Sequence, residues 1–385
     1  MRADLRGAAS IVAAGATLAS IAYTAFALYR LRAFARRPPV RPQRREPITI
    51  LKPVHGLEFE LEENLRTFCS QDYPEYQVVL GVLDPGDPAL AALRRVAADC
   101  GDRVSVVTGD GVVRHRNPKI ATLAPMLAHA RHELLVIADS DMRVGRDYLD
   151  AIAAAFDDPQ VGAATCIYRG EAAGVGLASA VGAMAITEQF APSALVATTL
   201  ERMTYCFGGT MAVRRAVLDE IGGLDALGDQ LADDAALGRF TAEHGHRVAL
   251  AQYVAATVVD EPDLPALVAH ELRWARTIRS VRPRSYAGIV LTYPLPLALA
   301  FLALARERRV ALGLVALAAA ARVALHLAAH RVLGAPRRPS LALIPLRDVI
   351  GVAVWVLGLR GDDVRWRGRD LRIAPDGEIA PGQNG

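Results

Sequence analysis

The chain has 385 residues, a hydrophobic fraction of 52% and a formal net charge of +3. So small a charge does not suit a nucleic-acid polyanion, and we expect no nucleic-acid partner. The four cysteines form no CxxC pair, which excludes a disulfide framework and the usual zinc modules and fits a reducing compartment. Because the apolar residues gather near the two ends, we expect membrane segments on either side of a central domain.

The first predicted element is a membrane anchor. Residues Ala8–Tyr29 carry no charge, and a helix of that length can cross a hydrocarbon core of roughly 30 Å. Seven arginines follow within residues 30–45, so the positive-inside rule places the rest of the chain in the cytoplasm. A cleaved signal peptide is the alternative, because Ala25–Phe26–Ala27 resembles a cleavage site. The long apolar run and the dense arginine cluster favour the anchor.

Strand-like and helix-like runs alternate between residues 48 and 139. Apolar, partly β-branched runs predict strands at 48–54, 77–84, 103–108 and 134–139. Helical periodicity predicts helices at 60–69, 88–99 and 118–130, the last capped by Asn117. This order predicts an α/β fold with a mostly parallel sheet and flanking helices. Ligands of such sheets bind beyond the carboxyl ends of the strands.

Carboxylates stand at that edge of the predicted sheet. Asp84 ends the second strand, where it could accept hydrogen bonds from a ribose or a base; an Asx turn before Pro85 is the alternative. Asp139 and Asp141 follow a buried strand directly. They could hold a divalent cation on substrate phosphates, although DxD strings usually lie on solvated turns.

A third acidic position is Asp233–Asp234, early in a predicted helix that runs to His244. One of these carboxylates could face a cleft and act as a general base. The alternative is that both acids favour the positive N-terminal end of the helix.

Cationic and small residues supply further candidates. The chain contains only two lysines, Lys52 and Lys119, and a compact ammonium near phosphate would explain their use, as would chance. Gly208–Gly209–Thr210 could allow a ligand close to the backbone, or mark a bulge. The string His270–Glu271–Leu272–Arg273–Trp274 offers a guanidinium fork suited to a pyrophosphate beside an apolar ring.

The C-terminal third is apolar again. Ala287–Ala305 and Val310–Ala329 predict a hairpin of membrane helices, although Arg306, Arg308 and Arg309 would then lie on the wrong side. Leu341–Leu359 contains Arg347 and Asp348, so we expect a re-entrant or interfacial helix there. Buried helices of a soluble domain are the alternative.

In this order the signals resemble the family 2 and family 21 inverting glycosyltransferases, which have a GT-A, Rossmann-like fold. The family pattern of D, DxD, D and (Q/R)xxRW is matched at Asp84, Asp139–Ser140–Asp141, Asp234 and Arg273–Trp274. The strings that are similar to the ceramide glucosyltransferase branch are Leu51–Lys52–Pro53, Gln71–Asp72–Tyr73–Pro74, Asn117–Pro118–Lys119 and Ala232–Asp233–Asp234. The strings Arg273–Arg279 and Tyr293–Pro296 most resemble the hopanoid-biosynthesis-associated glycosyltransferases.

The resemblance implies a role for each matched residue. Asp84 would bind the uridine, while Asp139 and Asp141 would contact the ribose and hold Mg²⁺ or Mn²⁺ on the diphosphate. Asp234 would deprotonate the acceptor hydroxyl. Arg273 and Trp274 would hold the diphosphate and shape the acceptor site. His270 stands where the family has Gln or Arg, which puts the role of that position in doubt.

We therefore expect a metal-dependent, inverting glycosyltransferase that moves N-acetylglucosamine from UDP-GlcNAc to a hopanoid, bacteriohopanetetrol, at the cytoplasmic face of a bacterial inner membrane. A ceramide glucosyltransferase that uses UDP-glucose is the near alternative, and an inactive membrane scaffold that binds nucleotide sugar is the alternative of another class. The expected domains are an anchor and basic linker at 1–46, a cytosolic GT-A domain at 47–285, membrane helices at 286–360 and a basic, polar cytosolic tail at 361–385.

Overall fold

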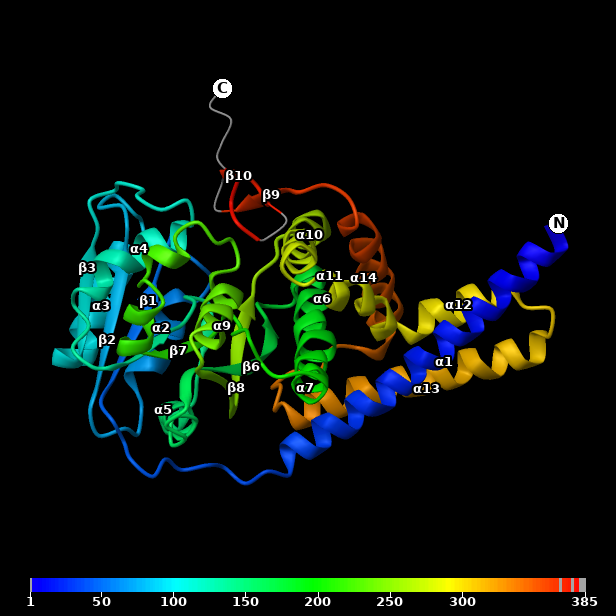
Figure 1. The fold of residues 1–385 in the computed structure, drawn as a ribbon, viewed down its shortest axis with the longest axis horizontal. Helices are drawn as coiled ribbons and strands as arrows, with labels where there is room; N and C mark the ends of the chain where they lie inside the picture. Colours follow the sequence, from blue (N-terminus) through cyan, green and yellow to red (C-terminus); the bar gives the residue numbers. More distant parts are fainter. Residues whose placement is uncertain (1, 367–368, 375–376, 381–385) are drawn as a thin grey trace. The chain divides into compact units, whose positions relative to one another are not determined.

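The structure, a computed structural model, describes residues 2–366, 369–374 and 377–380 (Figure 1). The chain forms two compact units. The sheet unit comprises Pro38–Tyr168, Arg202–Val258 and Asp363–Gly385, and the helix unit comprises Met1–Arg37, Arg169–Glu201 and Val259–Asp362. Each unit is thus assembled from three separate stretches of the chain.

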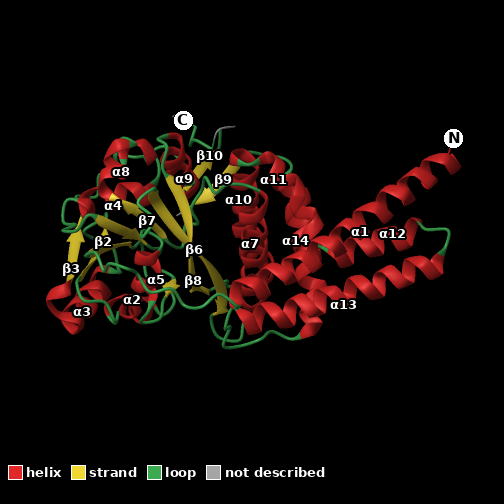
Figure 2. Cartoon of the chain, turned by 60° about the horizontal axis from the view of Figure 1, so that its bottom comes forward, coloured by secondary structure: helices red, strands yellow, loops and turns green. Residues whose placement is uncertain are grey.

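An eight-stranded sheet, in the order β3-β2-β1-β4-β7-β6-β8-β5, forms the centre of the sheet unit (Figure 2). Strands β1 to β4 pair in parallel, whereas β4–β7, β6–β7 and β5–β8 pair antiparallel. The predicted α/β fold class is confirmed, and the sheet is mixed because β7 runs antiparallel to both of its neighbours, β4 and β6. The strands are β1 Ile48–Pro53, β2 Tyr76–Val82, β3 Val104–Thr108, β4 Leu134–Ile137, β5 Met142–Arg143, β6 Val161–Ala172, β7 Met211–Arg214 and β8 Arg247–Val259.

Apolar cores lie on both faces of this sheet. Ile50 and Val136 contribute to one core, while their chain neighbours Leu51 and Ile137 contribute to the other. A strand buried on both faces has no polar alternation, which is why β1 and β4 appear in the sequence as continuous apolar runs. The helical elements of the sheet unit are α2 Leu61–Cys69, α3 Leu90–Cys100, η1 Gly101–Arg103, α4 Pro118–Leu127, α5 Tyr148–Ala154, α8 Arg215–Glu220, η3 Asp225–Leu227 and α9 Asp233–Glu243.

The helix unit contains long apolar helices, of which α1, α12 and α13 pack side by side (Figures 1 and 2). A π turn, η2, separates α6 from α7. The elements are α1 Arg2–Ala35, α6 Leu177–Ala185, η2 Ile186–Phe190, α7 Ala191–Leu200, α10 Leu264–Val281, α11 Pro283–Gly288, η4 Ile289–Thr292, α12 Pro294–Leu304, α13 Arg308–Val332, η5 Leu341–Leu343 and α14 Ile344–Gly358.

Within the described residues, four helices are long and apolar enough to cross a membrane: Arg6–Ala35, Leu177–Leu200, Arg308–Val332 and Leu341–Gly358. The pair Pro283–Thr292 and Pro294–Leu304 adds a fifth if its 73° bend lies within one span. This bend interrupts the apolar run predicted at 287–305, because Pro294 starts a new helix. Sequence reasoning missed Leu177–Leu200, whose mean hydropathy of 1.2 is lower than that of the other three spans.

The charged residues of α14 find partners on other helices rather than each other. Arg347 forms a buried, two-pronged ion pair with Glu271 of α10, and its Nη2 lies 2.7 Å from Glu271 Oε2. Asp348 accepts a hydrogen bond from Arg322 of α13 over 2.9 Å. These pairs explain how an apolar helix carries two charges with almost no exposure, since a buried charge needs a partner.

The C-terminal residues return to the sheet unit as a small hairpin of β9 (Asp363–Trp366) and β10 (Arg369–Arg372). Val364, Ile373 and Ile379 form an apolar cluster with Leu231. The Ile379 amide donates to Asp229 O at 2.7 Å, and the Leu231 amide donates to Gly377 O at 3.0 Å. The end of the chain therefore braces the loop that precedes α9.

Candidate functional site

Lys119 links two of the three acidic positions singled out in the sequence. Its ammonium lies 2.8 Å from Asp139 Oδ1, just after β4, and 3.3 Å from Asp233 Oδ2, at the start of α9. Lys119 and Asp233 are buried, whereas 40% of the surface of the Asp139 side chain is exposed to solvent. Burial alone would lower the pKa of Lys119, but the neighbouring carboxylates outweigh burial and raise it. Lys119 therefore remains an ammonium.

The loop before α4 positions that lysine. Asn117 caps the helix as predicted, because its side-chain oxygen accepts from the amides of Lys119 and Ile120 at 2.8 and 3.2 Å. Its amide nitrogen donates to Gln230 O at 2.8 Å and to Asp233 Oδ1 at 3.4 Å. One asparagine thus starts α4 and ties it to the loop that precedes α9.

Asp141 is held from the other side by β8. Its Oδ2 accepts a hydrogen bond from the Thr257 hydroxyl over 2.8 Å, and its backbone oxygen accepts from Val258 N over 3.0 Å. Its other oxygen, Oδ1, is buried and has no hydrogen-bond partner within the described part of the chain. Burial, and then the negative charge of Asp139, raise the pKa of Asp141 to about 7. A buried carboxylate oxygen of this kind can accept a hydrogen bond or bind a cation.

Gly208 leaves a small space in front of two acids. A Cβ at this glycine would lie 3.4 Å from Asp234 Oδ2 and 3.5 Å from Asp139 Oδ2. The pKa of the Tyr168 hydroxyl is raised, first by burial and then by the negative charges of Asp234, Asp139 and Asp141. All three carboxylates therefore act on this one hydroxyl. Asp139, Asp141 and Asp234, which are distant in sequence, therefore converge around one point.

Asp234 combines partial exposure with an altered acidity. Its Oδ1 accepts from the amide of Ala235 at 2.8 Å, and its Oδ2 faces the space at Gly208. Burial, and then the neighbouring charge of Asp233, raise the pKa of Asp234 to about 6, although Lys119 opposes this rise. A carboxylate with such a pKa is ionised at neutral pH and can still accept a proton from a nearby hydroxyl.

Lys52, in β1, contacts the backbone of Asp139 and is fully buried. Its ammonium donates to the backbone oxygen of Asp139 and lies 3.8 Å from the centroid of the Phe68 ring. Burial lowers the pKa of Lys52 to about 7, although Asp141 and Asp139 act in the opposite direction. These contacts fix the turn that carries Asp139, and a contact of Lys52 with a donor stays a prediction.

Asp84 lies at the same edge of the sheet but is exposed. The registers of β1 with β2 and with β4 set Gly81 beside Pro53 and Ile137 beside Leu51, so the residues after both strands emerge at one edge. The Asp84 carboxylate accepts from Gly86 N over 2.8 Å, which is the Asx turn considered as an alternative. Binding of uridine by Asp84 stays a prediction.

The remaining predicted residues lie on α10, in the helix unit. His270 Nδ1 lies 2.7 Å from Glu261 Oε1, and its ring centroid lies 4.3 Å from that of Trp274. The backbone oxygen of Arg273 accepts from the Thr277 hydroxyl at 2.9 Å. His270 therefore supports the Trp274 ring within its own helix. The approach of Arg273 and Trp274 to the aspartates stays a prediction.

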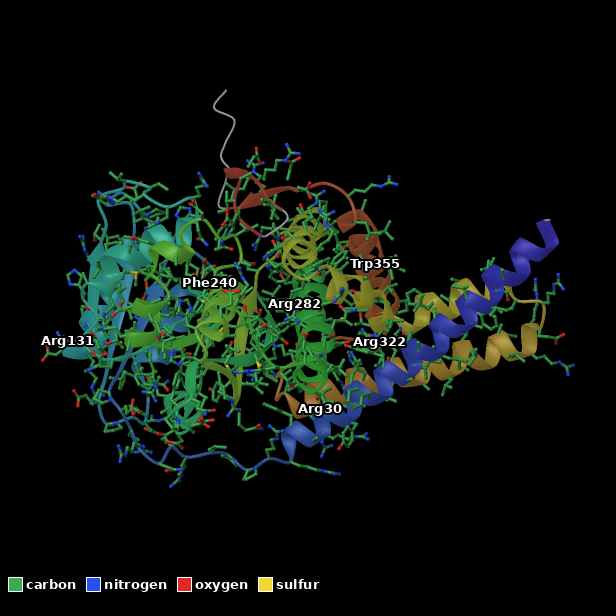
Figure 3. All side chains as sticks on the ribbon, in the orientation of Figure 1. Arg30, Arg131, Phe240, Arg282, Arg322 and Trp355 are labelled. Atoms are coloured by element: carbon green, nitrogen blue, oxygen red, sulfur yellow. The ribbon has the colours of Figure 1, made fainter. Side chains whose placement is uncertain are left out.

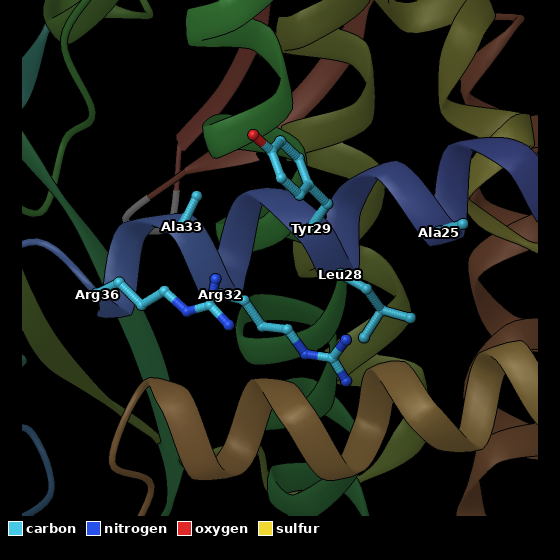
Figure 4. Close-up of a pocket in the computed structure, with 6 residues that line it drawn as sticks. All are labelled: Ala25, Leu28, Tyr29, Arg32, Ala33 and Arg36. Carbon is cyan, nitrogen blue, oxygen red and sulfur yellow. The ribbon is translucent and has the colours of Figure 1, made fainter.

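The helix unit has a surface hollow of its own. It runs along α1 and is lined by Ala25, Leu28, Tyr29, Arg32, Ala33 and Arg36 (Figure 4). The residues that line it include no carboxylate, histidine or cysteine.

A divalent cation fits the acids of the sheet unit. Asp141 Oδ1 is a buried carboxylate oxygen without a partner, and the glycine at 208 keeps the space beside Asp139 Oδ2 open. Carboxylate oxygens are the ligands that Mg²⁺ and Mn²⁺ prefer. Asp139 and Asp141 are the residues that would hold such an ion.

Sequence reasoning missed several contributors to this site. Thr257 and Tyr168 lie in long strands without any motif, and their position beside the acids follows from the pairing of β5, β6 and β8 with distant parts of the chain. Asp233 was recognised only as half of an acidic pair. Its burial against Lys119 depends on the fold and leaves no local signal.

Similar proteins point to one enzyme class. Ceramide glucosyltransferases 3 and 1 of Caenorhabditis elegans are 20% and 22% identical to this chain, over 87% and 66% of it and 74% and 55% of their own lengths. The chain thus spans about half the length of the second relative. The mannosyltransferase PcManGT from Pyrobaculum calidifontis, solved with GDP-Man and Mn²⁺, shares the fold, with a TM-score of 0.55, 22% identity and coverage of 91% and 99%.

The sequence pattern described as Glycosyl transferase family 21 matches residues 12–379, which is nearly the whole chain and includes every acid described above. The order of the aspartates in the sequence, their convergence in the sheet unit and this match agree. The chain belongs to glycosyl transferase family 21.

Proposed function

We propose that the chain transfers a hexose from a UDP-sugar to a hydroxyl group of a membrane lipid, and specifically N-acetylglucosamine from UDP-GlcNAc to bacteriohopanetetrol. The observation that carries the proposal is the convergence of Asp139 and Asp234 at Gly208, with Asp141 two residues after Asp139 and its charge acting on the same tyrosine, Tyr168. The apolar helices support a lipid acceptor, since a water-insoluble substrate requires an enzyme at the bilayer. The strings Arg273–Arg279 and Tyr293–Pro296 support the hopanoid.

Transfer of a glucosyl group from UDP-glucose to ceramide is the second candidate. It is favoured by the names of the relatives, four of which are ceramide glucosyltransferases. The two candidates differ in sugar and acceptor and use the same chemistry.

In the proposed mechanism Asp234 accepts the proton of the acceptor hydroxyl while the oxygen attacks the anomeric carbon. The bond to the diphosphate breaks on the opposite side, which inverts the anomeric centre and releases UDP. A divalent ion held by Asp139 and Asp141 would offset charge on the diphosphate. Lys119 keeps Asp139 in place, and Arg273 would add positive charge at the leaving group.

The proposed location is the cytoplasmic face of a bacterial inner membrane. Arginines in the last turns of α1 and just after it, among them Arg30, Arg32 and Arg36, support this orientation. The cytoplasm is also where nucleotide sugars are made.

The test is an assay of the purified full chain in lipid nanodiscs with UDP-GlcNAc or UDP-glucose and with bacteriohopanetetrol or ceramide. We expect a glycosylated hopanoid with UDP-GlcNAc, detected by mass spectrometry. Product only with ceramide and UDP-glucose would select the second candidate. Binding of UDP-sugar without product in any combination would contradict both and favour the scaffold.

Gly208→Ala tests the space in front of the acids. The new methyl group would lie 3.4 and 3.5 Å from carboxylate oxygens of Asp234 and Asp139, which are ordinary contact distances, so we expect an unchanged unfolding temperature. The methyl group would occupy space that the donor needs, and a displacement of about 1 Å costs on the order of 10²-fold in rate. We expect a loss of that size in kcat/KM, and full activity would show that the donor lies elsewhere.

Gly313→Ala on α13 is the control for this variant, because a Cβ there meets no atom within 4 Å, and it should leave transfer unchanged. Gly223→Ala is unsuitable because the φ of Gly223 is 70°, which strains any other residue.

The pH dependence of transfer reports on Asp234. Only the ionised carboxylate accepts a proton, and its pKa is raised to about 6. We therefore expect the rate to be constant above this pH and to fall about tenfold per pH unit below it. The measurement is kcat/KM against pH with saturating metal ion. An inflection of the rate near pH 4, the usual pKa of an aspartate, would contradict the effect of burial on the pKa of Asp234.

A further inference from the structure

The helix unit contains a second cluster of polar side chains, remote in sequence from the aspartates. Glu188 lies on the π turn η2, and His326 and His330 lie on α13. Glu188 Oε1 is 2.8 Å from His326 Nδ1 and 2.9 Å from His330 Nε2. All three residues are at most 5% exposed. Both helical segments are apolar enough to span a membrane, where ionisable residues are rare and mark function.

We propose that Glu188, His326 and His330 bind a divalent transition-metal ion of the zinc type. One ligand atom from each residue lies within 4.8 Å of the other two. In a tetrahedral site with bonds of roughly 2.0–2.1 Å, neighbouring ligand atoms lie about 3.3 Å apart. The observed separations of 2.8 and 2.9 Å need only small side-chain movements to reach this geometry.

The local sequence favours imidazole coordination. His326 and His330 are four residues apart, so one face of α13 presents both rings, as in helical zinc sites. The π turn sets Glu188 against them, and single π turns within helices occur frequently at functional sites. Two imidazoles and one carboxylate suit Zn²⁺ better than Mg²⁺, which prefers oxygen ligands alone.

Arg322, which is labelled in Figure 3, contacts the cluster and also binds Asp348, and these two residues set the charge of the cluster. Arg322 donates to Glu188 Oε2 at 2.7 Å and to Asp348 Oδ1 at 2.9 Å. This leaves Glu188 Oε1 to face the imidazoles. With neutral imidazoles, two carboxylates against one guanidinium leave one net negative charge, and the nearby Glu271–Arg347 pair does not change the balance. A buried cluster with a net negative charge attracts a cation.

The ion would join α13 to the turn between α6 and α7, which are otherwise distant in sequence. It would be separate from any cation at Asp139 and Asp141, because its ligands are different residues, two imidazoles and one carboxylate of the helix unit. The role assigned is the fixing of two membrane-helix segments, since a bound ion stabilises the state that binds it.

The experiment uses the full chain, purified in detergent through a tag without histidine and dialysed against Zn²⁺ and then a weak chelator. We expect one zinc per chain by plasma mass spectrometry. The double variant His326→Ala/His330→Ala should lose it, and the matched pair His244→Ala/His246→Ala, in the sheet unit, should keep it. Asp139→Asn/Asp141→Asn should also keep it, which separates this ion from the one at the aspartates.

A second measurement covers the case in which the double variant fails to fold. Wild-type chain loaded with Co²⁺ should show the visible absorption of a four-coordinate ion with nitrogen ligands, and Zn²⁺ should abolish it. Wild-type chain with no zinc above the level of the double variant, or without the Co²⁺ bands, would overturn the proposal. The histidines would then act only as hydrogen-bond donors to Glu188.

Discussion

Replacement of Asp234 by asparagine should abolish sugar transfer while the chain still binds UDP-sugar. The amide has the shape of the carboxylate but cannot take the proton of the acceptor hydroxyl, and loss of a positioned general base costs on the order of 10² to 10⁴ in rate. The side chain faces the space at Gly208 and forms no ion pair within hydrogen-bond distance in the described structure, so the fold should persist. Initial rates and calorimetric titration with UDP-sugar would measure the two effects.

Asp102→Asn is the matched control, because Asp102 is exposed on the short turn η1. It should leave both transfer and binding unchanged. Transfer by Asp234→Asn at the wild-type rate would remove this residue from the mechanism. Loss of binding and transfer together would instead assign Asp234 to the donor site.

Lys119→Met should destabilise the sheet unit by about 3–5 kcal/mol, which is the usual cost of removing one partner from a buried ion pair. Most of the loss should come from Asp233, because its carboxylate is buried and would keep an unpaired charge, whereas Asp139 is partly solvated. Thermal unfolding of the full chain in detergent would measure the effect. Transfer should also fall, since Asp139 loses the contact that positions it.

The double variant Lys119→Met/Asp233→Asn provides the control for this argument. It removes the buried charge of Asp233 as well as the ammonium of Lys119, so it should be more stable than Lys119→Met alone. Equal stability of the single variant and the wild type would mean that the pair contributes nothing. A double variant less stable than the single one would show that Asp233 has another role.

Much of the sheet unit could be predicted because its strands are buried on both faces. The runs at 48–54 and 134–139 became β1 and β4, and Asn117 became the cap of α4, since both features depend on local chemistry. The edge at which Asp84, Asp139 and Asp141 lie also followed, because the carboxyl ends of parallel strands meet there. Asp234 lies at the start of α9, and its place in the site was implied only by the family resemblance.

The rest depended on contacts between distant residues. The ion pair of Lys119 with Asp233 and the cluster of Glu188 with His326 and His330 join positions more than 100 residues apart, and no local pattern indicates such partners. The span at 177–200 was missed for a related reason. Glu188 interrupts its apolar pattern, and only the fold supplies the partners that make this charge tolerable.

The structure gives a physical reason why the chain uses lysine at positions 52 and 119. Both ammonium groups contact Asp139, one through the backbone oxygen and one through the carboxylate. Each lysine is almost fully buried, and the Lys52 ammonium lies over the Phe68 ring. A compact ammonium fits such spaces, whereas a planar guanidinium with five donors would leave several of them without acceptors.

The hairpin of β9 and β10 also sets an order of events during biosynthesis. The apolar cluster around Leu231 is completed by Val364, Ile373 and Ile379, which follow all the described helices in the sequence. The ribosome therefore synthesises those helices before the residues of the hairpin. The loop in front of Asp233 gains its support only after the helices have been made, and a product truncated before Asp363 would keep the helices but lose the support of this loop.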